Sequence, residues 1–153
     1  MEFLHKHKVI YRDLKPQNVG FDAAGTVQLF DFGLARVHCE GARLLTGFTG
    51  SARYMAPEVA WCDVYSFPAD VHAFAILLWE ISTLEKAFCK TLTMQQLVQQ
   101  VVHRHNRPSL KEVASPIIRE LLKVSWHRDS DMRPSFALVV KQLELEGQAI
   151  RAL

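Results

Sequence analysis

Four polar residues constrain the fold and the chemistry of this chain more than any other feature of its sequence. Asp13, Lys15 and Asn18 follow one another closely, and Asp31 opens the tripeptide Asp-Phe-Gly further along. Phosphoryl transfer needs a carboxylate to take a proton, a cation against phosphate oxygens, and hard oxygen ligands for Mg²⁺. Asp13 is the candidate base, Lys15 the candidate phosphate contact, and Asn18 and Asp31 the candidate metal ligands. Such residues also occur in ordinary turns, but that explanation would have to account for the whole ordered set.

A predicted β-hairpin explains how these residues could meet. Two short alternating segments, 18–22 and 26–30, are separated by the turn residues Ala23-Ala24-Gly25, which is typical of a hairpin. Asn18 would enter the first strand and Asp31 would leave the second. The turn would therefore bring both candidate ligands to the same end.

Helix dominates the prediction after residue 55, so the expected fold class is α+β and mainly α. Residues 68–83 are apolar on nearly every face, which indicates a buried central helix. Thr93 and Gln96 have the spacing of a capping box, followed by an apolar stripe that begins at Met94. Ser115-Pro116 and Pro134 are predicted to open two further helices. Before them, residues 34–54 predict a long loop.

Composition describes an ordinary globular chain. Its 153 residues are 49% apolar and 22% charged, which suits one domain with a core of its own. A net charge of +2 is too small to favour nucleic acid, and the longest apolar run, 73–79, is too short to span a bilayer. The three cysteines, Cys39, Cys62 and Cys89, lack motif spacing, and we expect an intracellular, cytoplasmic location.

The ordered motifs resemble the C-terminal lobe of eukaryotic-type protein kinases over nearly the whole chain. The run 13–18 matches the family's D-L-x-x-x-N catalytic loop, 31–33 matches its D-F-G, and 56–58 matches its A-P-E. The resemblance implies a kinase domain at 1–147, a short tail at 148–153, ATP and Mg²⁺ as cofactors, and a protein substrate. It gives Asp13, Lys15, Asn18 and Asp31 the roles stated above, with Lys15, Asn18 and Asp31 as the ATP-binding set.

The resemblance further implies serine/threonine specificity. A lysine within Asp13-Leu14-Lys15-Pro16 is similar to serine/threonine kinases, whereas tyrosine kinases differ there. Residues 70–74 and 133–136 look most like the tyrosine-kinase-like group of serine/threonine kinases. The implied reaction moves the ATP γ-phosphoryl group to Ser or Thr hydroxyls of proteins.

Residues 34–55 resemble the family's activation segment. Ser51 stands where the family has a hydroxyl residue bonded to the catalytic aspartate and lysine. Thr46 and Thr49 are candidate phosphorylation sites in this segment. The residues that could pair with such a phosphate are Arg12 and Arg36. An exposed loop without regulation accounts for the two threonines equally well.

Three further matches bear on the fold. Glu58 and Arg133 match the family's buried ion pair, and Asp70 matches the aspartate of the central helix that holds the catalytic loop. Phe32 and Gly33 complete the D-F-G motif. The loss of one partner of a buried ion pair costs about 3–5 kcal/mol, so these residues are predicted to be structural.

The chain also departs from the family pattern. Tyr11 replaces a histidine and can still stack on Phe32, so we interpret it as tolerated. Gly20 replaces a larger apolar residue beneath the adenine ring, which we favour as ordinary variation. The family's Gly-rich loop, strand lysine and helix glutamate have no counterpart in these 153 residues, so the resemblance implies a C-terminal lobe without its N-terminal lobe. We therefore expect this chain alone to be inactive, and an inactive kinase-like fragment that binds proteins is the alternative function.

Overall fold

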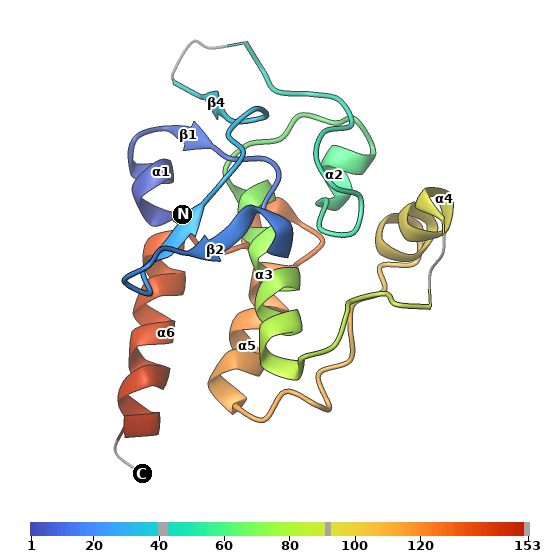
Figure 1. Ribbon diagram of the computed structural model, residues 1–153. Helices are drawn as coiled ribbons and strands as arrows, with labels where there is room; N and C mark the ends of the chain where they lie inside the picture. Colours follow the sequence, from blue (N-terminus) through green and yellow to red (C-terminus); the bar gives the residue numbers. More distant parts are fainter. Residues whose placement is uncertain (40–42, 91–92, 152–153) are drawn as a thin grey trace.

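The structure is a computed structural model that describes residues 1–39, 43–90 and 93–151 (Figure 1). The helices are α1 (Glu2–Lys6), α2 (Pro57–Ala60), α3 (Pro68–Thr83), α4 (Met94–Val98), α5 (Pro116–Ser125) and α6 (Phe136–Arg151). The strands are β1 (Val9–Ile10), β2 (Val19–Phe21), β3 (Val27–Leu29) and β4 (Arg36–Val37). Single turns of 3₁₀ helix span Pro16–Asn18 and Ser130–Met132, and a π-helical turn spans Gln99–His103. The prediction of a mainly helical α+β chain with a small hairpin is confirmed.

The described residues form two small antiparallel sheets, and both lie above α5 in the view of Figure 1. In the predicted hairpin, β2 pairs with β3 so that Val19 lies opposite Leu29. In the other sheet, β1 pairs with β4, and Val9 lies opposite Val37. The sequence prediction missed β4 and assigned it to the loop 34–54, because a strand of two residues shows no alternation.

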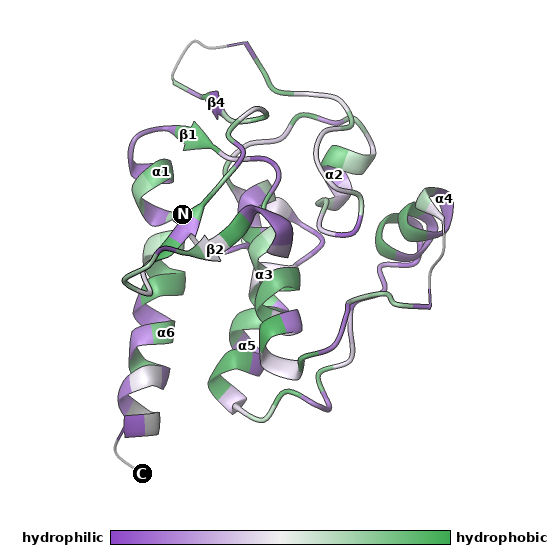
Figure 2. Cartoon of the chain, in the orientation of Figure 1, coloured by the Kyte–Doolittle hydropathy of each residue, from purple (hydrophilic) through white to green (hydrophobic). Residues whose placement is uncertain are grey.

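Helix α3 forms the centre of the core, and α5 packs against both α3 and α6. Ile76 of α3 and Leu122 of α5 are fully buried, and Val139 of α6 is nearly so. Figure 2 shows apolar colour through the middle of α3 and along much of α5, with mixed colour along α6. The bounds of α3 match the predicted helix 68–83, but its last turn reaches solvent, since Ile81 is 61% exposed. None of the helices in the described part of the chain is long and apolar enough to cross a membrane.

Of the three helix starts predicted after α3, two are present. The Thr93 side chain accepts from the Gln96 amide, and the Gln96 side chain accepts from the Thr93 amide, which completes the capping box. Ser115 Oγ accepts from the Ile118 amide at 3.1 Å. Helix α6 begins at Phe136, two residues beyond the predicted start at Pro134. Met94 was predicted to join the buried stripe of α4 and is instead 55% exposed.

The end of the chain is helical as far as it is described. Helix α6 continues through residues 148–151, so that part of the predicted tail extends the last helix. Residues 152 and 153 of the tail lie outside the described residues, as do residues 40–42 of the predicted loop.

His72 of α3 is expected to make the fold less stable in acid. Its ring is fully buried, and its Nδ1 lies 3.4 Å from the Tyr54 carbonyl oxygen. Burial lowers the pKa of His72 well below its ordinary value, with help from the charges of Arg133 and Arg107. Below pH ~6.5 the unfolded chain therefore binds a proton that the folded chain excludes, and stability falls as the pH falls.

Urea unfolding between pH 7 and pH 5 checks this expectation. His72→Phe should reduce the loss of unfolding free energy on acidification, by up to about 1.4 kcal/mol for each pH unit below the unfolded pKa. His127→Phe, at an exposed position, is the control and should leave the loss unchanged. Equal pH dependence in the His72 variant and the unaltered chain would show that this ring does not carry the effect.

Candidate active site

The carboxylate of Asp13 is the centre of the predicted site. It is nearly buried, with 8% of its surface exposed. Lys15 Nζ donates to Asp13 Oδ2 at 2.6 Å, and Ser51 Oγ donates to Asp13 Oδ1 at 2.8 Å. Asn18 Nδ2 donates to the Asp13 backbone oxygen at 2.9 Å and to Oδ2 at 3.2 Å. The structure therefore brings together four predicted residues and fixes the direction of the Asp13 carboxylate.

Ser51 reaches Asp13 from a distant segment, and Gly50 makes this approach possible. The backbone of Gly50 has φ of +91°, a region that other residues rarely adopt. A β carbon at this position would also lie only 2.3 Å from the backbone oxygen of Arg12. Glycine is therefore required where the two segments meet. Gly50 was not among the residues predicted from the sequence, although its place directly before the predicted hydroxyl residue was a signal.

Asp70 holds the backbone of the catalytic loop, which we define as residues 11–18. It lies in the first turn of α3 and is 1% exposed. Its Oδ2 accepts from the Tyr11 amide and its Oδ1 from the Arg12 amide, both at 2.8 Å. His5 Nε2 also lies 2.9 Å from Oδ2. The sequence predicted the contact to the loop and missed His5, whose partner is 65 residues away.

The hairpin brings the two candidate metal ligands to one end, as predicted. The Phe30 amide donates to the Asn18 carbonyl oxygen at 2.9 Å, so Asp31 follows directly after the residue that faces Asn18. Asp31 has φ of +52°, and its exposed Oδ1 accepts from the Gly33 amide at 3.2 Å. An amide and a carboxylate supply the oxygen atoms that Mg²⁺ prefers. Within the described residues no cluster of three or more His, Cys, Asp or Glu forms a metal site.

Aromatic rings lie beside Gly20 and Asp31 in the hairpin. A β carbon built on Gly20 would lie 2.8 Å from the ring of Phe30, so this ring covers the glycine. Half of the Phe30 surface is exposed. Tyr11 is fully buried, and its ring meets Phe32 edge-on at a centroid distance of 5.3 Å. The predicted contact between Tyr11 and Phe32 is therefore present.

The two arginines near the activation segment bind backbone and tyrosine oxygens. Arg12 Nε donates to the Leu34 carbonyl at 2.6 Å, and its Nη1 donates to Tyr65 Oη at 2.9 Å. Arg36 Nη1 donates to the Ala35 carbonyl at 2.8 Å. In the described ranges, neither arginine has a hydrogen bond to Thr46 or Thr49. Phosphorylation of these threonines stays a prediction.

Glu58 and Arg133 form the predicted ion pair. Arg133 Nη1 and Nη2 donate to the two carboxylate oxygens of Glu58 at 2.7 and 2.8 Å. Arg133 also donates to the carbonyl oxygens of Pro68 and His127. The pair ties α2, next to the activation segment, to the start of α3 and to the segment before α6.

Comparison with known proteins agrees with this geometry. A family model described as the protein kinase domain matches residues 1–143. The chain belongs to the eukaryotic-type protein kinase family. Asp13, Lys15, Asn18 and Asp31 all lie within the residues that the family model matches.

Similar proteins are also kinases. The serine/threonine-protein kinase STY17 of Arabidopsis thaliana is 39% identical over 94% of this chain and 25% of its own length. The dual specificity protein kinase shkB of Dictyostelium discoideum is 36% identical over 100% of this chain and 24% of its own length. The serine/threonine/tyrosine-protein kinase HT1 of Arabidopsis thaliana is 32% identical over 99% of this chain and 38% of its own length. The chain thus spans about a quarter of the length of the first two relatives. These relatives are consistent with the predicted tyrosine-kinase-like group.

Proposed function

We propose that this chain supplies the catalytic residues of a protein serine/threonine kinase that transfers the ATP γ-phosphoryl group to protein hydroxyls. The observation that carries the proposal is the orientation of Asp13. Its carboxylate is held by Lys15 and Ser51, one on each oxygen, and its backbone by Asn18. Such a group can orient an acceptor hydroxyl and take its proton.

The other residues have matching tasks in this proposal. Lys15 would move its charge to the γ-phosphoryl oxygens as negative charge develops there. Asn18 and Asp31 would hold Mg²⁺, which neutralises the phosphate charge when it is bound. The half-exposed ring of Phe30 would offer the adenine an apolar surface where the family uses the side chain at position 20.

Phosphorylation of a mixed Ser, Thr and Tyr peptide library tests the proposal, with the 153-residue chain joined to the N-terminal lobe of a related kinase so that the nucleotide site can close. Asp13→Asn keeps the size of the side chain and removes the base, and it should lower the rate by about 10²–10⁴. Product analysis should place the phosphate on Ser or Thr. Phosphate on Tyr would contradict the specificity, and equal rates for both chains would contradict the role of Asp13.

The exposure of Asp31, a candidate metal ligand, favours one other function. Asp31 is exposed and Phe32 is 47% exposed, so this end of the hairpin is open to solvent. A kinase-like chain that binds proteins without phosphoryl transfer is the alternative. The unaltered chain would then transfer no more phosphate than Asp13→Asn does.

The cysteines support an intracellular place of action for this proposed kinase. Cys39, Cys62 and Cys89 are free and exposed. Exposed free thiols are typical of compartments that keep cysteine reduced, such as the cytoplasm.

A further inference from the structure

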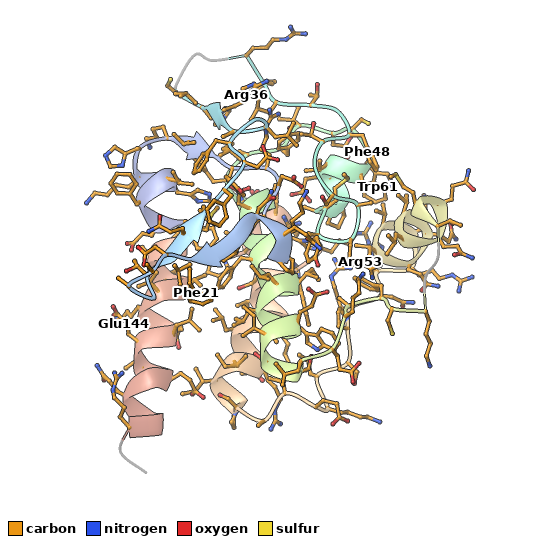
Figure 3. All side chains as sticks on the ribbon, in the orientation of Figure 1. Phe21, Arg36, Phe48, Arg53, Trp61 and Glu144 are labelled. Atoms are coloured by element: carbon orange, nitrogen blue, oxygen red, sulfur yellow. The ribbon has the colours of Figure 1, made fainter. Side chains whose placement is uncertain are left out.

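A shallow depression lies on the surface beside Asp13, and three cations line it. We call it the cationic depression and define it by Lys15, Gln17, Ser51, Arg53, Tyr54 and Lys86. It joins the catalytic loop to residues 51–54 and to the segment after α3. Figure 3 shows Arg53 beside α3, on the side of the molecule that carries α4.

The carboxylates near this depression are already satisfied. Asp13 is paired with Lys15. Glu80 Oε2 accepts from Tyr54 Oη at 2.9 Å, and its Oε1 accepts from the Ala87 amide at 2.8 Å. Neither carboxylate lies within ion-pair distance of the other two cations in the depression.

Two cations in the depression form no ion pair with any of the described residues. The guanidinium of Arg53 donates to the Ala87 carbonyl oxygen, which is neutral. Lys86 is exposed and has no ion pair with any residue in the described ranges. The adjacent Glu85 is also exposed and does not line the depression. The depression thus attracts negative charge immediately beside the candidate base.

The position of Arg53 determines how far an acidic residue of a bound peptide would lie from the acceptor hydroxyl. Ser51 touches Asp13, and residues 51–54 form a turn in which the Tyr54 amide donates to the Ser51 carbonyl oxygen at 2.9 Å, so Arg53 stays close to Ser51. Two residues of a bound peptide in extended conformation span about 7 Å. A bound peptide with its hydroxyl at Asp13 would therefore reach Arg53 and Lys86 with a residue two or three positions away.

We propose, on the premise of the kinase function above, that the cationic depression binds the protein substrate and selects acidic sequences. The preferred substrate carries aspartate or glutamate two or three residues from its acceptor serine or threonine. Arg53 and Lys86 hold these carboxylates, and the neutral Gln17 adds no opposing charge.

Fluorescence anisotropy with labelled peptides and the 153-residue chain tests this proposal without ATP. One peptide carries Asp at the second and third positions on both sides of a serine, and its control carries Asn there. We expect the Asp peptide to bind about fivefold to tenfold more tightly at low salt, as two exposed ion pairs would give. The preference should shrink in high salt because exposed charges are screened.

Charge reversal assigns the preference to the depression. Lys86→Glu should reduce the preference for Asp at least about threefold, and it should improve the binding of a peptide with Lys in place of Asp. Lys141→Glu changes the net charge equally on an exposed position of α6, and it should leave the preference unchanged.

The possible results separate this inference from the proposed function. Equal binding of the Asp and Asn peptides, no binding of the Asp peptide, or equal effects of the two variants would overturn the inference. A chain that phosphorylates peptides without acidic preference would keep the kinase function and overturn the inference as well. Acid-selective binding that depends on Lys86, together with no phosphoryl transfer by the protein that includes the N-terminal lobe of a related kinase, would support the depression and contradict the kinase function.

Discussion

The Arg133→Ala variant is expected to lower the free energy of unfolding by about 3–5 kcal/mol. The side chain of Arg133 is buried, and it binds both oxygens of Glu58 as well as three backbone carbonyls. Alanine would leave the Glu58 carboxylate without its cation, although only 15% of that side chain reaches water. The cost is therefore that of an unpaired charge in the interior, which exceeds the net contribution of the pair.

Urea unfolding measures this effect, and a double-mutant cycle with Glu58→Ala assigns it to the pair. The double variant should lose less free energy of unfolding than the two single variants lose together, because neither partner is then left unpaired. Arg128→Ala removes an exposed arginine close in sequence and should change stability by less than about 0.5 kcal/mol. A loss for Arg133→Ala no larger than that of Arg128→Ala would mean that the ion pair does not hold the fold together.

The parts of the site that the sequence predicted depend on short separations along the chain. Asp13, Lys15 and Asn18 lie in one loop, and a hairpin of three paired residues on each strand returns the chain to Asp31. Turn residues and alternation determine such a hairpin locally. The spacing of the motif was therefore enough to place these residues together.

The parts that the sequence missed depend on contacts between distant segments. The two-residue strand β4 is defined only by its pairing with β1, and His5 meets Asp70 only once α1 and α3 are packed. The effect of Gly20 could not be judged either, because the ring that covers it belongs to Phe30 on the returning strand. No local pattern specifies contacts of this kind.

Asp70→Asn is expected to loosen the catalytic loop and to lower the free energy of unfolding by about 2–3 kcal/mol. The carboxylate accepts from two loop amides and from His5. An amide of the same size has one oxygen, so its NH₂ group would face at least one of these buried donors. The loss of a charged acceptor leaves that donor unsatisfied.

The consequence of this loss extends to the candidate base. Arg12 has φ of +72°, a backbone conformation that is unfavourable for a residue other than glycine and needs support from its surroundings. Asp70 provides this support through the Arg12 amide. Since Asp13 follows directly, relaxation of Arg12 would turn the Asp13 carboxylate away from Lys15 and Ser51.

Hydrogen exchange and urea unfolding together check this expectation. The amides of Tyr11 and Arg12 should exchange faster in Asp70→Asn than the loss of global stability alone explains, since their own acceptor is changed. Asp131→Asn, at an exposed aspartate without a side-chain contact in the described residues, should leave both measurements nearly unchanged. Unchanged protection of the two loop amides in Asp70→Asn would refute the view that Asp70 sets the loop conformation. Faster exchange confined to these amides would show that the central helix, rather than the loop sequence alone, determines where the base points.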